Sequence, residues 1–150
     1  MATDEETSLI AATRRAYDAV ASTYARVLAD TSFEAAEDLE LVQYFSASFR
    51  GRPARILDAG CGAGRMITYL RSLSDGLQIS RSDLSPAMAA IARSIHQDCE
   101  VAVADNANLP FAGSWFEGVL AWYSIIHTAP DDLDAVFTEF ARVLRPDGLL

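Results

Sequence analysis

A chain of 150 residues, about half of them apolar, is long enough to form one domain with a substantial core. Its 21 acidic residues outnumber its 12 basic ones and give a net charge of −9 at pH 7. Because binding to polyanions depends on basic side chains facing phosphates, this composition predicts no nucleic-acid partner and no binding to an anionic membrane.

The sequence carries signals about the cellular location of the protein and about whether the chain is part of a longer one. The N-terminus, MATDEETSLI, lacks the basic start and apolar run of a signal peptide, and no apolar stretch is long enough to cross a bilayer. The two cysteines are too few for a disulfide framework. We therefore expect a cytoplasmic protein. The chain ends LRPDGLL, where a new apolar segment begins, and we expect it to be the front portion of a longer protein.

The first fifty residues are predicted to be helical. Apolar residues recur every three or four positions over residues 8–29, and again over residues 32–49. The sequence RGRP then ends the second helix, because glycine and proline interrupt helices. We expect residues 1–50 to form an N-terminal helical cap.

Short apolar runs then alternate with amphipathic segments. The expected strands cover residues 54–60, 76–83, 99–105 and part of 116–127, and the expected helices cover residues 64–74, 85–97 and 130–148. This alternation predicts an α/β fold, a Rossmann-like, doubly wound and mostly parallel sheet with helices on both faces, over residues 51–150. Ligands of such sheets bind beyond the carboxyl ends of the strands.

A glycine-rich loop follows the first strand, in the sequence ILDAGCGAGR. The dinucleotide pattern G-x-G-x-x-G requires glycine where this chain has Arg65, and no Lys-Ser or Lys-Thr pair follows as in a P-loop. The spacing is instead D-x-G-x-G-x-G, from Asp58 to Gly64. Glycines at alternate positions allow the backbone to pass close to a ligand.

ILDAGCGAGR resembles the first motif of the class I S-adenosylmethionine-dependent methyltransferases. Three later segments resemble the same family in order and spacing: SDLSPAMAAIAR, ADNANLPFAGSWFEGVLAWYSIIH and FTEFARVLRPDGLL. The segment AYDAVASTYAR resembles the N-terminal helix that lies over the cofactor in small-molecule members. The resemblance covers nearly the whole chain. It also implies a fifth strand, a helix and a terminal hairpin, which we expect to be absent from this chain and to leave the fourth strand without its usual neighbour.

The resemblance implies a set of residues that bind S-adenosylmethionine and its product S-adenosylhomocysteine. Around the methionyl and ribose portions it implies the loop residues Asp58, Gly60, Cys61, Gly62, Gly64 and Arg65. It implies that Asp83 accepts hydrogen bonds from the ribose hydroxyls, and that the carbonyl of Trp122 or Ala121 accepts from the methionyl ammonium. Around the adenine it implies Leu84, Met88, Asp105, Asn106 and Ala107. It implies that Tyr17 and Tyr24, on the N-terminal helix, lie over the bound cofactor.

Each of these residues also has a simpler interpretation. Asp58 and Asp83 are alternatively ordinary turn residues, Asp105 is alternatively a solvated acid of a loop, and Met88 is alternatively an ordinary core residue. Tyr17 and Tyr24 fall on one helix face, where core packing accounts for them as well as cofactor contact does. Arg65 either binds the cofactor carboxylate or lies on the surface.

His127 follows the fourth strand and is the candidate general base for an acceptor that must lose a proton. A loop or helix-start role is the alternative. His96 and Cys99 have H-x-x-C spacing, but two ligands do not form a zinc site, so we expect no metal.

The expected activity is methyl transfer from S-adenosylmethionine to a small-molecule acceptor by in-line displacement. The fourth strand ends in AWYS, whereas family members that methylate base amines often carry Asn/Asp-Pro-Pro-Tyr/Phe there. The alternatives are a non-catalytic cofactor-binding module on the same fold and an NAD-dependent oxidoreductase. A homodimer is a further expectation.

Overall fold

The computed structural model of the chain describes residues 4–150, so the first three residues of the expected cap lie outside the described part. The helices are α1 (Asp4–Val27), α2 (Ala36–Ala47), α3 (Arg65–Leu73), α4 (Pro86–Ile95) and α5 (Leu133–Val143), with two 3-10 turns, η1 (Thr31–Phe33) and η2 (Pro130–Asp132). The strands are β1 (Ala54–Ala59), β2 (Leu77–Asp83), β3 (Val101–Val103), β4 (Phe116–Leu120) and β5 (Leu144–Leu149).

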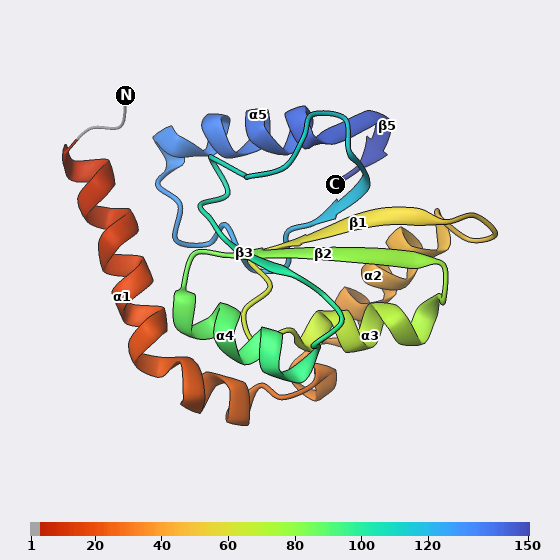
Figure 1. The fold of residues 1–150 in the computed structure, drawn as a ribbon, viewed down its shortest axis with the longest axis horizontal. Coiled ribbons are helices and arrows are strands. Elements are labelled where there is room, and N and C mark those ends of the chain that lie inside the picture. The colour runs from red at the N-terminus through yellow and green to blue at the C-terminus, as the bar shows by residue number, and fades with distance from the viewer. Residues whose placement is uncertain (1–3) are drawn as a thin grey trace.

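The five strands form one parallel sheet in the order β3-β2-β1-β4-β5. Figure 1 shows α5 on one face of the sheet and α2, α3 and α4 on the other, while α1 runs past the carboxyl ends of the strands. The expected Rossmann-like architecture is confirmed. Because the strand order turns outward from β1 in both directions, the crevice where ligands bind in such sheets lies between β1 and its neighbours.

Two apolar cores lie on opposite faces of β1, because successive side chains of a strand point to opposite sides. Ile56 packs with side chains of α2, α3 and β2, including Phe45 and Leu70. Leu57, the next residue, packs with Val119 of β4 and with the α5 stripe of Val136, Phe140 and Val143. Both faces of the central strand are therefore buried, which accounts for its continuous apolar run.

The start of α4 is fixed by two polar side chains. Ser85 is its N-cap, with the Oγ atom accepting from the Met88 amide at 3.1 Å, and Pro86 occupies the first helical position. The carboxylate of Asp18, on α1, accepts from the Ser85 hydroxyl at 2.5 Å and from the Ala87 amide at 3.1 Å. This contact joins α1 to the end of the helix that follows β2.

The last expected helix is shorter than the sequence predicted. It ends at Val143 rather than near Gly148, and residues Leu144–Leu149 form β5 beside β4. The expectation that the fourth strand lacks a neighbour is therefore wrong. β5 is irregular: Leu144 pairs with Phe116 and Leu149 with Gly118, and Asp147 adopts a left-handed φ of 64° in the bulge between them.

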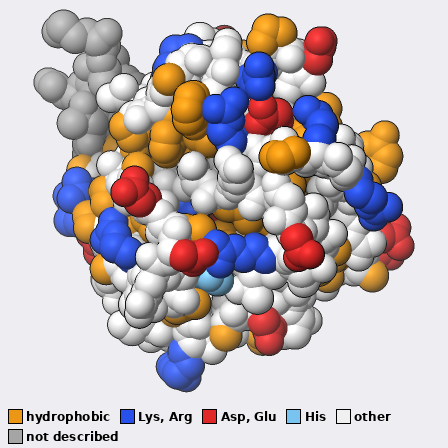
Figure 2. All heavy atoms as spheres, turned by 45° about the vertical axis from the view of Figure 1, so that its right-hand side comes forward, with side chains coloured by type: hydrophobic (Ala, Val, Ile, Leu, Met, Phe, Trp, Pro, Cys, Tyr) orange, Lys and Arg blue, Asp and Glu red, His pale blue; other side chains and the backbone are white. Residues whose placement is uncertain are grey.

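Two surface properties bear on partners. Among residues 4–150, no helix combines the length and apolar character needed to cross a membrane. On the face shown in Figure 2, arginine and acidic side chains are interspersed rather than gathered into one broad basic area.

Gly118 sets how closely α2 packs on the sheet. A Cβ atom at this position would lie 2.7 Å from Cζ of Phe45 and 2.8 Å from Cζ of Phe49. We expect Gly118→Ala to lower the free energy of unfolding by about 1–3 kcal/mol, because the two rings must shift in a packed core. Urea denaturation measures the change.

Gly113→Ala is the matched control, since its nearest neighbour would be the Arg142 carbonyl oxygen at an ordinary 3.4 Å. Equal stability of the two variants would show that the α2 packing against β4 is looser than described.

Candidate active site

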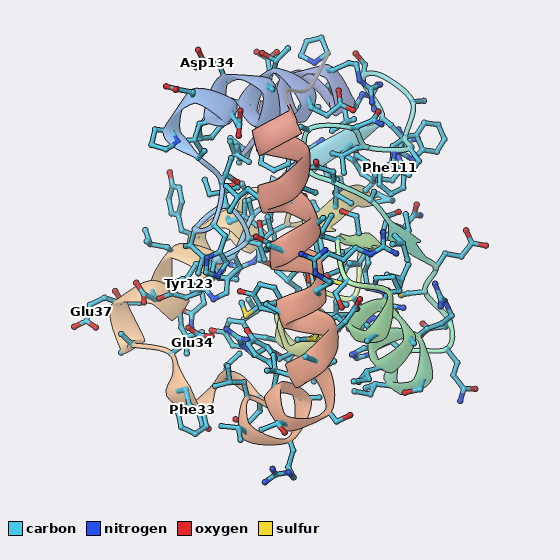
Figure 3. The ribbon with its side chains drawn as sticks, turned by 90° about the vertical axis from the view of Figure 1, so that its left-hand side faces the viewer. Phe33, Glu34, Glu37, Phe111, Tyr123 and Asp134 are labelled. Atoms are coloured by element: carbon cyan, nitrogen blue, oxygen red, sulfur yellow. The ribbon has the colours of Figure 1, made fainter. Side chains whose placement is uncertain are left out.

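A cavity of about 140 Å³ lies at the carboxyl ends of the strands, beneath α1. Twelve of the residues named from sequence line it, and they come from α1, the start of α4 and the loops after β1, β2, β3 and β4: Tyr17, Tyr24, Gly60, Gly62, Asp83, Leu84, Met88, Asp105, Asn106, Ala107, Trp122 and His127. Figure 3 looks onto α1, which crosses in front of these loops. Residues more than a hundred positions apart in sequence thus meet in one place.

A second, smaller cavity of about 30 Å³ lies beside the glycine loop. Asp58, Cys61 and Arg65 line it, together with Tyr24, Gly60, Gly62 and Trp122, which line both cavities. Of the residues named from sequence for the cofactor, Gly64 and the alternative carbonyl position Ala121 line neither of these two cavities.

Gly64 lies instead against His96. A Cβ atom on Gly64 would be 3.1 Å from the imidazole Cδ2, and the imidazole Nε2 is 3.2 Å from the Gly64 carbonyl oxygen. Cys99 receives a 2.7 Å contact from an Arg71 guanidinium nitrogen. Within the described residues, no three His, Cys, Asp or Glu side chains converge on a possible metal position.

The glycine loop depends on a backbone conformation that favours glycine. Gly60, Gly62 and Gly64 have φ angles of 74°, 54° and 95°. At Gly60 there is also no room for a side chain, because a Cβ atom would lie 2.2 Å from Cβ of Ser124. The missing side chain at Gly60 therefore allows the loop to pack against the segment that leaves β4.

Asp83 joins the end of β2 to the glycine loop. Its Oδ2 accepts from the Gly62 amide at 2.8 Å, and its Oδ1 accepts from the Ser85 amide at 2.8 Å. Burial raises the pKa of Asp83, while these two amide donors oppose the rise. Asp83 is thus a turn residue and a wall of the cavity at once, and each oxygen retains a lone pair for a further donor.

Asp58 is a buried carboxylate at the end of β1, with 1% of its surface exposed. Neither of its oxygens has a hydrogen-bond partner among the described residues. Burial, and then the charge of Asp83, raise the pKa of Asp58 to about 7, against the opposing effect of Arg81 and Arg65. A cation or hydrogen-bond donor bound next to this carboxylate would offset the free-energy cost of burying its charge.

The loop after β3 carries Asp105 and Asn106. The Asp105 Oδ1 accepts from the Ala107 amide at 3.0 Å and so forms a turn. The Asn106 amide group lies 3.5 Å from the Ser124 carbonyl oxygen. Both side chains nonetheless border the cavity.

Arg65 is engaged by protein groups. Its guanidinium donates to the Glu34 carboxylate at 2.6 and 2.9 Å and to the Tyr24 hydroxyl at 2.9 Å. Both partners of the Arg65–Glu34 ion pair are largely buried. The arginine therefore fastens α1 and the η1 segment to the start of α3.

Tyr17 and His127 meet across the larger cavity. The His127 Nε2 atom and the Tyr17 hydroxyl are 3.0 Å apart, and the rings pack edge to face. Burial, followed by Tyr24 and Asp83, raises the pKa of Tyr17, so its phenol stays protonated at neutral pH. The histidine and its hydroxyl partner thus lie at the wall that α1 and the loop after β4 share.

The sequence profile of the methyltransferase domain family matches residues 56–148, from β1 into β5. The chain belongs to this family. A malonyl-[acyl-carrier protein] O-methyltransferase of Hahella chejuensis is 35% identical to it over 136 residues, which cover 89% of this chain and 46% of that protein. The chain spans less than half the length of these curated relatives.

Solved structures share the fold. The 1,6-didemethyltoxoflavin-N1-methyltransferase of Burkholderia thailandensis, with 1,6-didemethyltoxoflavin and S-adenosylhomocysteine bound, is similar with a TM-score of 0.70 and 23% identity, over 99% of this chain and 62% of that one. Magnesium protoporphyrin IX methyltransferase of Synechocystis, with bound SAM, gives a TM-score of 0.73 at 18% identity, over 91% and 72% of the two chains.

Sequence reasoning missed part of the cavity wall. The additional lining residues include Leu9, Ile10 and Thr13 of α1, Ser124 and Thr128 after β4, and Ala129, Ala135 and Val136 around the start of α5. Helical spacing offered one signal, since Leu9, Thr13 and Tyr17 are four residues apart and share a face of α1. The contribution of α5 had no such signal.

The buried carboxyl of Asp58 should make stability depend on pH. Its pKa is about 7 in the folded chain and about 3.9 when unfolded, so the folded state holds the proton over that interval. The contribution of this proton to the free energy of unfolding is therefore fully present below about pH 4. It falls as the pH rises from there and is lost once the pH has passed 7. We expect Asp58→Asn to unfold at higher urea than the natural chain at pH 7.5, with a smaller difference at pH 5.

Asp75→Asn, at an exposed loop position, serves as the control for a changed net charge. A stability difference between Asp58→Asn and the natural chain that is the same at both pH values would contradict the raised pKa.

Proposed function

We propose that the chain holds the cofactor site of an S-adenosylmethionine-dependent methyltransferase that methylates a small-molecule acceptor by in-line displacement. The observation that carries this proposal is the convergence of three carboxylates, Asp58, Asp83 and Asp105, with the glycine loop at the ends of β1, β2 and β3. The family membership and the O- and N-methyltransferase names of its relatives support it.

The buried polar groups fit this cofactor. The orphaned Asp58 carboxylate would accept from the methionyl ammonium, and Asp83 has lone pairs for the two ribose hydroxyls. The Trp122 indole nitrogen is buried, and among the described residues it has no acceptor, so it would donate to the methionyl carboxylate. Arg65 already donates to Glu34 and Tyr24, so we assign that role to Trp122.

The adenine would lie at the loops after β2 and β3. Leu84 and Met88 supply apolar contacts there, while Asp105 and Asn106 supply an acceptor and a donor. Met88 is buried against Ala21 and Ala63 as well as bordering the cavity, so it serves the core and the proposed site together.

The bound cofactor supplies a methyl group already activated by the positive sulfonium. The protein then has to align the acceptor and exclude water, and no metal ion is needed. Where the acceptor is a hydroxyl, a base must take its proton, and His127 is the proposed base. A homodimer and a cytoplasmic location remain predictions.

Titration calorimetry tests the cofactor site directly. We expect the chain to bind S-adenosylmethionine and S-adenosylhomocysteine, and Asp83→Ala to weaken both at least tenfold, because the ribose hydroxyls lose their acceptor and the loop loses its Gly62 bond. Asp75→Ala is the control.

Absence of binding by the natural, folded chain would refute the proposal, as would preferential binding of NAD. Cofactor binding without methyl transfer to any acceptor would favour a non-catalytic module of the same fold.

His127→Ala tests the base. With a hydroxyl acceptor, we expect kcat to fall by about 10²–10⁴-fold, the range typical of general base catalysis, while the affinity for the cofactor stays within threefold. A variant that retains full turnover would remove His127 from the mechanism.

A further inference from the structure

Asp18, on α1, binds the first turn of α4 through one carboxylate oxygen. Figure 1 shows α1 passing beside this turn, where the Asp18 Oδ1 accepts from the Ser85 hydroxyl at 2.5 Å and from the Ala87 amide at 3.1 Å. These two donors lower the pKa of the Asp18 carboxyl, which is therefore ionised at neutral pH. Asp18 lines neither of the two cavities described above, so nothing in the proposed site has yet used it.

The bond to Asp18 fixes the direction of the Ser85 hydroxyl. Ser85 is buried, with 1% of its surface exposed, and its single hydroxyl hydrogen points to the carboxylate in a short, charge-assisted bond. The lone pairs of Oγ then face the Met88 amide, from which they accept at 3.1 Å. The N-cap of α4 is thus completed by a side chain of α1.

The turn that Asp18 binds also carries the proposed acceptor of the ribose hydroxyls. The Ser85 amide donates to the Asp83 Oδ1 at 2.8 Å, while the Asp83 Oδ2 accepts from the Gly62 amide at 2.8 Å. A continuous chain of hydrogen bonds therefore runs from Asp18 through Ser85 to Asp83 and on to the glycine loop. A displacement of Ser85 would displace Asp83 with it.

We propose that Asp18 is a positioning residue for the cofactor site, which acts through Ser85 to hold the Asp83 carboxylate where it accepts from the ribose hydroxyls. The inference rests on the proposed function and extends the machinery of that site to α1. A carboxylate that is already in place raises affinity, because the turn does not have to become ordered when the cofactor binds.

A different role for Asp18 would be to dock α1 and nothing more. Docking has other supports, since Ala21 of α1 packs against Ala63 and Met88, and Tyr24 accepts from the Arg65 guanidinium at 2.9 Å. Loss of the Asp18 bonds should therefore loosen the turn before β2 joins α4 without detaching the helix.

Calorimetry with S-adenosylhomocysteine measures the effect on affinity. Asp18→Ala removes the acceptor, and we expect the affinity to fall at least fivefold. Asp18→Asn keeps an oxygen that accepts from Ser85 and Ala87, so its affinity should stay within twofold of that of the natural chain. Asp30→Ala is the control, because Asp30 is exposed, caps η1 through the Ser32 amide and lines neither cavity. It should leave the affinity unchanged.

A double-mutant cycle separates positioning from docking. If Asp18 acts through Asp83, then Asp18→Ala should weaken binding by less than twofold in a chain that already carries Asp83→Ala, since the residue that it positions is gone. If Asp18 only docks α1, the two losses multiply. Multiplied losses would overturn the inference, and so would an equal loss of affinity in Asp18→Ala and Asp18→Asn.

Amide hydrogen exchange of the ligand-free chain tests the same linkage without the cofactor. In Asp18→Ala, verified as folded by circular dichroism, we expect the amides of Ser85 and Gly62 to exchange at least threefold faster, because both are bonded to Asp83. Asp30→Ala should leave both rates unchanged.

The two measurements distinguish failure of the linkage from failure of the cofactor site. Unchanged exchange at Ser85 and Gly62 in Asp18→Ala would overturn the positioning role, even if the natural chain binds S-adenosylhomocysteine. Absence of binding by the natural chain would refute the proposed function and this inference with it.

Discussion

The attachment of the glycine loop to the end of β2 is the contact on which the site depends. The Ser82 carbonyl oxygen accepts from the amides of Gly60 and Cys61, at 2.8 and 2.9 Å, and the Asp83 carboxylate accepts from Gly62. These bonds hold the loop in a conformation that favours glycine and bring two carboxylates, Asp58 and Asp83, into one desolvated region. Burial, and then the charge of Asp83, raise the pKa of Asp58, while Arg65 and Arg81, the register partner of Asp58 on β2, offset only part of this rise.

Much of the fold could be predicted from sequence because local signals were strong. The N-cap at Ser85, the apolar run of β1 and the stripe of α5 each follow from short-range physical chemistry. β5 was missed because Leu144 also fits the helical stripe of α5. The signal that ends that helix is pairing with Phe116 on β4, a contact between positions distant in sequence that no local pattern encodes.

The candidate site divides in the same way. Residues that occur in motifs, such as Asp83 and Asp105, were found from spacing and resemblance, and most of them border one cavity. The hydrogen bonds that hold the elements around the site together could not be predicted from sequence. Glu34 reaches Arg65, and Asp18 reaches Ser85, only after the helices have packed. The close packing of Ser124 against Gly60, which leaves no room for a side chain at Gly60, likewise could not be predicted from local sequence.

The position of α1 has a further thermodynamic consequence. Polar contacts hold it to three different parts of the chain: Tyr17 to His127, Asp18 to the start of α4, and Tyr24 to Arg65. Because α1 also supplies part of the cavity wall, every ligand contact with that wall favours the docked helix over its detached states. The observed affinity is then the intrinsic affinity multiplied by the docked fraction. A substitution on the outer face of α1 can change that affinity without touching a single ligand atom.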